Sequence, residues 1–255
     1  MPEHFDAAWH PGRGITLYGR KPALEALQDA SLTIRCLHLA KSNRPASIIA
    51  QIVKEAERRC ITILYHDRQA LSRISKNGRQ DQGVALDVAC PNFMTLEAFI
   101  DLPAMPRTVL ALDGVTNPQN VGMIIRSAAA AGVDGLLYPK RGIASLGPLV
   151  IKASAGNVFR APMIRCDSTA AAVTALKAKG YQVATLEASA TTSLFEFNAA
   201  DNLVCVLGAE SEGIGREVAV LADTRLTVPM ANGVESLNVA VTAALVCFHF
   251  GQTPD

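Results

Sequence analysis

The sequence predicts an α/β protein with a mostly parallel sheet flanked by helices, preceded by a smaller α/β module. Three observations support this class. Apolar residues make up 49% of the 255 residues and charged residues 18%, as in a packed globular protein. Aromatic residues are few (5%), so small aliphatic side chains dominate the apolar share. Short apolar runs of strand length alternate with runs of helix length, which is typical of parallel sheets covered on both faces.

The smaller module is expected at residues 14–90, after a loose tail at residues 1–13. That tail lacks the basic start and apolar core of a secretory signal. Amphipathic periodicity predicts helices at residues 22–30, 47–59 and 68–75. Short apolar runs predict strands at residues 34–40, 61–66 and 83–90. Residues 91–106 hold three prolines around one short helical piece and are predicted to be a linker.

The larger domain is expected at residues 107–255. Apolar runs predict its strands at residues 108–115, 133–139, 161–165, 181–187, 202–208 and 224–230. Helices are expected at residues 119–132, 169–180, 213–222 and 237–250. The last of these is apolar on nearly every face, which predicts a buried helix. Ligands of such sheets bind at the carboxyl ends of the strands, so the loops there are the candidate sites.

Charge is distributed unevenly along the chain. Residues 11–80 hold 13 Lys and Arg against 5 Asp and Glu, whereas the rest of the chain has a balance of −7. A basic module joined to an acidic one suggests that the first half handles a polyanion. The alternative is that these charges are solvated helix faces.

Cysteine and histidine give no sign of a disulfide framework or a metal site. The six cysteines are scattered without CxxC spacing, so a protein of the reducing cytoplasm is expected. The five histidines form no metal-ligand pattern, and His38 and His249 are expected to be satisfied core residues. No apolar run reaches transmembrane length, so no membrane partner is expected.

The first candidate loop is DGVTNPQNVGMIIR, from Asp113 to Arg126. Asn120 lies near the start of the predicted helix, where its side chain could simply cap free N–H groups. Arg126 could likewise be a surface charge. The helix around Arg126 is otherwise Met, Ile and Ala, however, so we expect its guanidinium to face a cleft with an anionic partner.

Two further loops follow apolar strands. LGAESEGIG carries Glu210 between glycines, which permit close approach of the backbone to a ligand. It is neither a Walker loop nor a GxGxxG motif. VPMANGVESLN places Glu235, Ser236 and Asn238 at the start of the last helix. One polar residue would suffice as a cap, so three of them beside a Pro and Gly bend suggest the wall of a site.

Taken together, these segments carry a resemblance that none of them carries alone. NPQNVGMIIRSA, LGAESEGI and VPMANGVESLNVAVTAAL, in this order, closely resemble the SpoU/TrmH branch of the SPOUT superfamily, the S-adenosylmethionine-dependent RNA ribose 2′-O-methyltransferases. The resemblance covers about residues 107–255. Residues 14–88 resemble the substrate-binding domain often fused in front. Asn157, Ala240 and Asp81 depart from the family pattern, the last of them within the substrate domain.

The resemblance implies a trefoil knot in the larger domain, S-adenosylmethionine as methyl donor, no metal, and a homodimer formed through the knotted domain. The catalytic residues that it implies are Arg126, Asn120, Glu210, Ser236 and Asn238. The residues implied in donor binding are Leu207, Gly208, Val228, Met230 and Leu237. RNA contacts are expected from basic side chains of the first module, among them Arg20, Lys21 and Arg44. The expected substrate is ribosomal RNA, with transfer RNA second.

Two other classes remain open at this point. A nucleotide-dependent oxidoreductase would share the sheet, but the first strand–helix turn of the larger domain lacks the glycine fingerprint of dinucleotide sites. An RNA-binding relative that has lost activity would keep the fold without the reaction. All five expected catalytic residues are present, which favours an enzyme.

Overall fold

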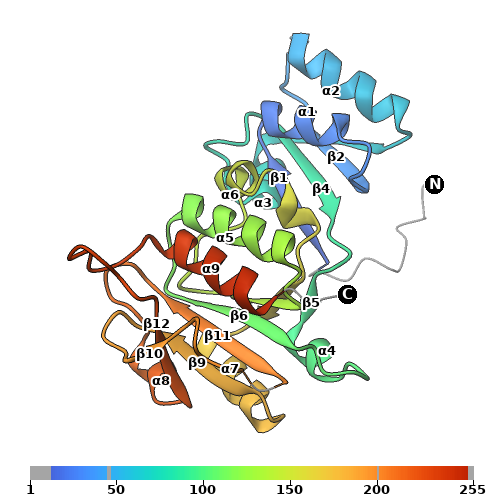
Figure 1. Ribbon diagram of the computed structural model, residues 1–255. Coiled ribbons are helices and arrows are strands. Elements are labelled where there is room, and N and C mark those ends of the chain that lie inside the picture. The colour runs from blue at the N-terminus through green and yellow to red at the C-terminus, as the bar shows by residue number, and fades with distance from the viewer. Residues whose placement is uncertain (1–12, 45–46, 200, 252–255) are drawn as a thin grey trace. The chain divides into compact units, whose positions relative to one another are not determined.

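The computed structural model describes residues 13–44, 47–199 and 201–251 (Figure 1). The chain divides into two compact units, and the division falls between Pro91 and Asn92. Of the predicted tail at residues 1–13, all but Arg13 lies outside the described residues.

The first unit is a four-stranded sheet with three helices. Its strands are β1 (Gly14–Tyr18), β2 (Ile34–Ala40), β3 (Thr62–His66) and β4 (Val84–Ala89). Its helices are α1 (Arg20–Gln28), α2 (Ser47–Arg58) and α3 (Arg68–Ser75). The strand order is β1-β4-β2-β3, in which only β2 and β3 run parallel. The sequence analysis missed β1, because five residues with no flanking periodicity carry little signal.

A polar network crosses this sheet at His38 on β2. One ring nitrogen, Nδ1, lies 3.0 Å from Nε2 of His66, and the other, Nε2, lies 3.1 Å from Oδ2 of Asp87. Thr16 donates a hydrogen bond of 2.7 Å to the second oxygen of Asp87. His38 is therefore a satisfied core residue, as predicted. His249, for which we predicted the same, is instead exposed beside the rings of Phe195 and Phe250.

The network shifts the pKa of each histidine in a different direction. Burial alone lowers the pKa of His38, but hydrogen bonds to Asp87 and Cys36 outweigh burial and raise this pKa to about 9. Burial lowers the pKa of His66, and the nearby charge of His38 lowers it further. At neutral pH the pair therefore carries one positive charge, on the ring of His38.

We expect proton titration of the histidine rings by NMR to show a midpoint for His38 near pH 9 and one for His66 below its ordinary value of 6.5. Because the pKa of His38 is higher in the folded chain, its contribution to stability is full below pH ~6.5 and is lost as the pH rises through about 9. Asp87→Asn should bring the His38 midpoint back down. A His38 midpoint at or below 6.5 in the unaltered protein would contradict this assignment.

The second unit is built on an eight-stranded sheet in which all strand pairs run parallel. Its strands are β5 (Met94–Thr95), β6 (Thr108–Asp113), β7 (Gly135–Pro139), β8 (Met163–Cys166), β9 (Gln182–Leu186), β10 (Thr192–Ser193), β11 (Leu203–Gly208) and β12 (Thr224–Thr227). Its helices are α4 (Leu96–Ile100), α5 (Pro118–Ala131), α6 (Pro148–Ala153), the short 3₁₀ helix η1 (Asn157–Phe159), α7 (Thr169–Ala178), α8 (Arg216–Ala219) and α9 (Val239–Phe250). The strand order is β10-β12-β9-β11-β6-β7-β8-β5, which confirms the predicted class of a mostly parallel sheet. The trefoil knot stays a prediction.

Helices cover both faces of this sheet (Figure 1). Alternate residues of the central strands, such as Val109 and Val204, pack against Val173 and Leu176 of α7. On the other face, α5 and α9 lie side by side. The inner strands are buried throughout, which explains their unbroken apolar sequences.

Several predicted boundaries change in the structure. Most of the predicted linker, residues 91–106, belongs to the second unit, because β5 pairs with β8 and Phe99 of α4 lies in the core. The helix predicted at residues 213–222 shortens to α8, and the strand predicted at 224–230 ends at Thr227. Glycine and proline around these segments limit their extension.

The last helix also differs from its prediction. It begins at Val239 and is not buried on every face, since the side chains of Val241 and Phe248 are each 49% exposed. A helix that is apolar all round gives no sequence signal for which face the sheet covers. No helix in the described part of the chain is long and apolar enough to cross a bilayer.

Candidate active site

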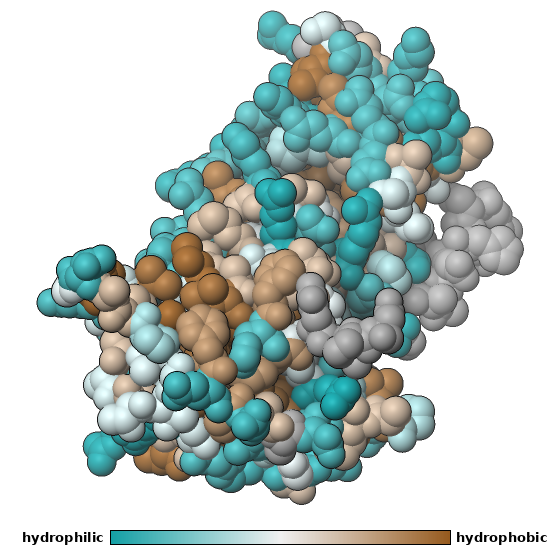
Figure 2. Space-filling model, in the orientation of Figure 1, coloured by the Kyte–Doolittle hydropathy of each residue, from teal (hydrophilic) through white to brown (hydrophobic). Residues whose placement is uncertain are grey.

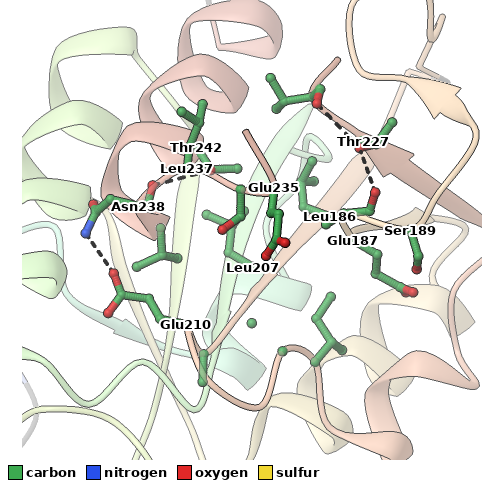
Figure 3. A pocket seen from close by; sticks show the side chains of 18 of the residues that line it. Leu186, Glu187, Ser189, Leu207, Glu210, Thr227, Glu235, Leu237, Asn238 and Thr242 are labelled. Atoms are coloured by element: carbon green, nitrogen blue, oxygen red, sulfur yellow. Dashed lines mark hydrogen bonds between the residues drawn. The ribbon is translucent and has the colours of Figure 1, made fainter. Parts of the chain in front are cut away.

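Side chains from three distant loops meet at the carboxyl edge of the large sheet. Nδ2 of Asn120 donates to Oε1 of Glu210 at 2.9 Å, and Nδ2 of Asn238 donates to the same oxygen at 2.7 Å. Nδ2 of Asn238 also lies 3.2 Å from Oδ1 of Asn120. The contact between Asn238 and Glu210 is visible in Figure 3. We call these three residues the amide–carboxylate cluster.

The helix start at Asn120 leaves its side chain free for this role. Asn117, not Asn120, is the N-cap of α5, and its Oδ1 accepts from the backbone N–H of Gln119 at 2.9 Å. Pro118 then fixes the first helical position. Asn120 is 4% exposed, and its amide points to Glu210. The prediction that Asn120 does more than cap a helix is therefore consistent with its contacts.

The side chain of Asn238 caps α9 and also binds Glu210, and the cap fixes the orientation of its amide. It is the N-cap of α9, where its Oδ1 accepts from the backbone N–H of Ala240 at 2.9 Å. Because the oxygen is held by the helix, the NH₂ group faces the cluster and can donate to Glu210.

Glu210 is presented by a tight turn. The backbones of Ala209 and Gly213 exchange two hydrogen bonds of 2.9 Å, so the chain folds back on the end of β11. A Cβ at Gly208 would lie 2.3 Å from the carbonyl carbon of Gly213, and Gly213 has a φ of +67°. Glycine is thus required at both positions for the turn to form.

Two helices begin at this carboxylate. Asn120 lies in the first turn of α5 and Asn238 caps α9, and both bind Glu210. The helices end together as well, because a Cβ at Gly251 would lie 2.6 Å from the carbonyl oxygen of Ala131. The N-terminal ends of two helices therefore converge on the carboxylate of Glu210.

A cavity of about 590 Å³ opens beside the cluster. All five residues expected to bind the methyl donor line it: Leu207, Gly208, Val228, Met230 and Leu237. Glu210 and Asn238 line it too (Figure 3), as does Ser236. We call this cavity the donor pocket. Three further carboxylates line it, Glu187, Glu212 and Glu235, and the one cation of the wall, Arg225, lies with its Nε 3.7 Å from Oε1 of Glu187. The charge of the pocket is therefore negative, which suits a cationic ligand.

One wall of this pocket was not predicted. It consists of Leu186, the last residue of β9, and of Glu187 and Ser189 just after it, and β9 lies next to β11 in the sheet. The sequence showed that these residues lie at the end of an apolar strand. It did not show that β9 pairs with β11, which is what brings them to the pocket. The rule that ligands bind at strand ends is the signal that would have found them.

Arg126 lies outside the donor pocket. It follows Asn120 by six residues, which turns it to another side of α5, and its side chain is exposed there with Met123. It makes no ion pair or hydrogen bond with any described residue. Among the described residues Arg126 has no anionic partner, so the expectation that its guanidinium faces one stays a prediction.

The basic residues singled out in the first unit differ in their surroundings. Arg20 is engaged within the unit: its Nε donates to the carbonyl of Gln82 at 3.1 Å and its Nη2 to Oδ1 of Asn43 at 3.3 Å. Lys21 and Arg44 are exposed. Within the described residues, no group of His, Cys, Asp and Glu side chains has the arrangement of a metal site.

The sequence matches a known protein family over most of both units. Residues 107–248 match the SpoU rRNA methylase family. The chain belongs to this family. Residues 16–94 match the domain described as RNA 2′-O ribose methyltransferase substrate binding.

Known SpoU-family proteins resemble the chain along most of its length. It is 36% identical over 233 residues to an uncharacterized tRNA/rRNA methyltransferase of Mycolicibacterium vanbaalenii, covering 89% of this chain and 73% of that one. Among solved structures, a putative TrmH-family RNA methyltransferase of Porphyromonas gingivalis has a TM-score of 0.62 at 24% identity, covering 93% of this chain and 89% of the other. The SpoU methyltransferase AviRb of Streptomyces viridochromogenes, solved in complex with AdoMet, has a TM-score of 0.62 at 20% identity, covering 93% and 89%. The SpoU-family fold is thus shared along both units.

Proposed function

We propose that this SpoU-family methyltransferase transfers the methyl group of S-adenosylmethionine to a ribose 2′-hydroxyl of RNA, with ribosomal RNA as the first candidate and transfer RNA as the second. The observation that carries the proposal is the amide–carboxylate cluster at the mouth of the donor pocket. The similarity to structures and curated relatives described as RNA methyltransferases, including one with bound AdoMet, supports it.

The donor pocket fits S-adenosylmethionine in size and charge. A cavity of about 590 Å³ lies within the range of small-ligand sites. Leu207 and Leu237 offer apolar contacts to the adenine, and the main chain around Gly208, Val228 and Met230 offers N–H and C=O groups to its edge. The surplus of glutamates favours the sulfonium and ammonium charges.

In the proposed reaction, the ribose O2′ attacks the methyl carbon in line with the sulfur. The O–C bond forms as the C–S bond breaks, the sulfur keeps the electron pair, and the hydroxyl proton leaves to an acceptor or to water. Alignment of the three atoms supplies much of the rate. Arg126 would stabilise the developing alkoxide or hold the adjacent phosphate, since a guanidinium scarcely deprotonates. Glu210 would orient Asn120 and Asn238, with which it is bonded. Ser236 lies at the wall beside them.

The test is methyl transfer from tritiated S-adenosylmethionine to transcripts of ribosomal RNA and of transfer RNA. A 2′-O-methylated ribose blocks alkaline cleavage at its 3′ phosphate, so the label should appear in an alkali-resistant dinucleotide. Label in the base, or RNA binding with no transfer to either RNA, would contradict the proposal. The second outcome would identify an inactive RNA-binding relative.

We propose that Arg20, Lys21 and Arg44 contribute to RNA binding by the basic first unit. Lys21 and Arg44 are exposed and could reach phosphates directly, whereas Arg20 would act by holding the loop at Asn43 and Gln82 in place. Free cysteines throughout the described chain are consistent with the proposed cytoplasmic location.

A homodimer formed through the larger domain is also proposed, and an exposed apolar surface supports it. Val241 and Phe248 of α9 are each 49% exposed, and Met123 of α5 is 42% exposed. Figure 2 shows hydrophobic side chains gathered over and beside α9. Apolar patches of this kind mark association surfaces. Arg126 shares the exposed side of α5 with Met123, so this association would bring it beside a second copy.

We expect sedimentation equilibrium to give about twice the chain mass of 27.0 kDa for the unaltered protein. Val241→Glu should shift it to the monomer, because a charge in an apolar interface is costly to desolvate. Val220→Glu is the matched control, since Val220 is 74% exposed at the end of α8, away from this surface. A monomer for the unaltered protein, or dimers for both variants, would exclude this interface.

A further inference from the structure

A second cavity, of about 890 Å³, opens at the carboxyl edge of β6, β7 and β8. Its wall consists of the residues that follow these strands and the start of α8, among them Asp113, Arg141, Ser168 and Arg216. The proposed reaction does not use it. We call it the flanking pocket.

The flanking pocket is connected to the donor pocket through shared walls. An intermediate cavity of about 660 Å³ shares Asp113, Gly114, Gly215 and Arg216 with the flanking pocket. The same intermediate cavity shares Glu210, Glu212 and Gly213 with the donor pocket. The three cavities therefore form one series along the edge of the sheet, with the amide–carboxylate cluster near one end.

The two ends of this series differ in charge. The donor pocket has four glutamates and one arginine. In the flanking pocket, Lys140 is neutralised by Asp167 at 2.5 Å, and Asp113 accepts from the backbone N–H of Gly215 at 2.7 Å. The side chains of Arg141 and Arg216 are exposed and make no hydrogen bond or ion pair with any described residue, which leaves their guanidinium groups free to bind an anion. Glu217 is the one further acid of this wall.

One of the two hydroxyls of the flanking pocket has its donor engaged within the protein, because Thr169 Oγ1 donates to the carbonyl of Leu112 at 2.8 Å. Ser168 Oγ accepts from the backbone N–H of Ala171 at 3.2 Å and keeps its O–H free to donate to an anion. Besides the paired Lys140, the charged donors of this pocket are the two guanidinium groups. Guanidinium groups bind phosphate oxygens through paired N–H donors and are less suited to reading a neutral sugar.

We propose that the flanking pocket holds backbone phosphate of the RNA strand next to the methylated nucleotide, with Arg141 and Arg216 as the phosphate ligands. This inference rests on the proposed function, because the strand must enter the series at the donor pocket. It assigns these two arginines to positioning of the RNA and not to the chemical step.

The experiment measures RNA affinity and its dependence on salt with the full-length protein and an in vitro transcript of ribosomal RNA as probe. Arg141→Ala and Arg216→Ala should each weaken binding about tenfold, and each should lower the slope of log affinity against log salt by about one. Arg107→Ala is the matched control, because Arg107 is an exposed arginine just before β6, at the opposite edge of the sheet. S-adenosylmethionine affinity should be the same in all three variants.

Unchanged RNA affinity and salt slope in Arg141→Ala and Arg216→Ala would overturn the inference. The inference would also be overturned if Arg107→Ala lost as much RNA affinity as the two variants, because the loss would then reflect only the overall charge of the protein. RNA binding is read without turnover, so it is independent of methyl transfer by the unaltered protein. Absence of methyl transfer alone would reject the proposed reaction, whereas a loss of affinity confined to the two variants would still support the flanking pocket as a phosphate site.

Discussion

Replacing Arg126 by alanine is expected to lower the rate of methyl transfer by about 100- to 1,000-fold while S-adenosylmethionine affinity changes by less than about twofold. The first effect follows from the proposed role of Arg126, a cation that would stabilise charge developing on the ribose oxygen. The second follows from the position of Arg126, which does not line the donor pocket. Initial rates at saturating RNA and isothermal titration calorimetry with the methyl donor measure the two effects.

Arg126→Lys is the second variant to measure, because lysine keeps the positive charge but lacks the paired N–H donors of the planar guanidinium group. Partial activity in this variant would indicate charge stabilisation, whereas activity as low as in Arg126→Ala would indicate paired contacts to a phosphate. Both variants should fold normally, since the side chain is exposed and makes no hydrogen bond or ion pair with other described residues. Loss of donor affinity in Arg126→Ala would show that the assigned role is wrong.

Asn238→Ser is expected to lower methyl transfer by about 100-fold with little loss of stability. A serine can still cap α9, but it cannot donate to Glu210 as the amide does at 2.7 Å. Glu210 would then keep only its bond to Asn120, and the loop would lose its link to the last helix. Rates with labelled donor and thermal unfolding by circular dichroism measure the two quantities.

Asn238→Ala separates the two tasks of this residue. It removes the cap as well as the link, so it should match the serine variant in activity and be less stable by about 1 kcal/mol. If Asn238→Ser retained the activity of the unaltered protein, the amide–carboxylate cluster would be a structural feature and Ser236 the stronger candidate beside the donor.

The helices and central strands could be predicted because their signals are local. The proline at position 118 and Gly132 mark α5 within one residue at each end. Unbroken apolar runs such as residues 203–208 mark buried parallel strands. Elements without such signals were missed, namely β1, β5, α6 and the two-residue strand β10, because short pieces are fixed by what they pair or pack with.

The candidate site was predictable only in part. The resemblance of three motifs singled out Asn120, Glu210 and Asn238, and the structure joins their side chains in one cluster. The pattern could not give the direction of Arg126, since its side of α5 depends on how that helix packs on the sheet. It also could not show that Asn117 holds the cap and frees Asn120.

By itself, the sequence determined the parallel α/β class, the basic character of the first unit and the three polar loops that follow apolar strands. The tertiary structure decided which strands are neighbours, and thereby which loops share a pocket. The physical reason is range: periodicity and capping act over a few residues, whereas the contact between Asn120 and Asn238 joins positions 118 residues apart. Such a contact forms only when β6 and β11 pair and α9 packs beside α5, which no short segment encodes alone.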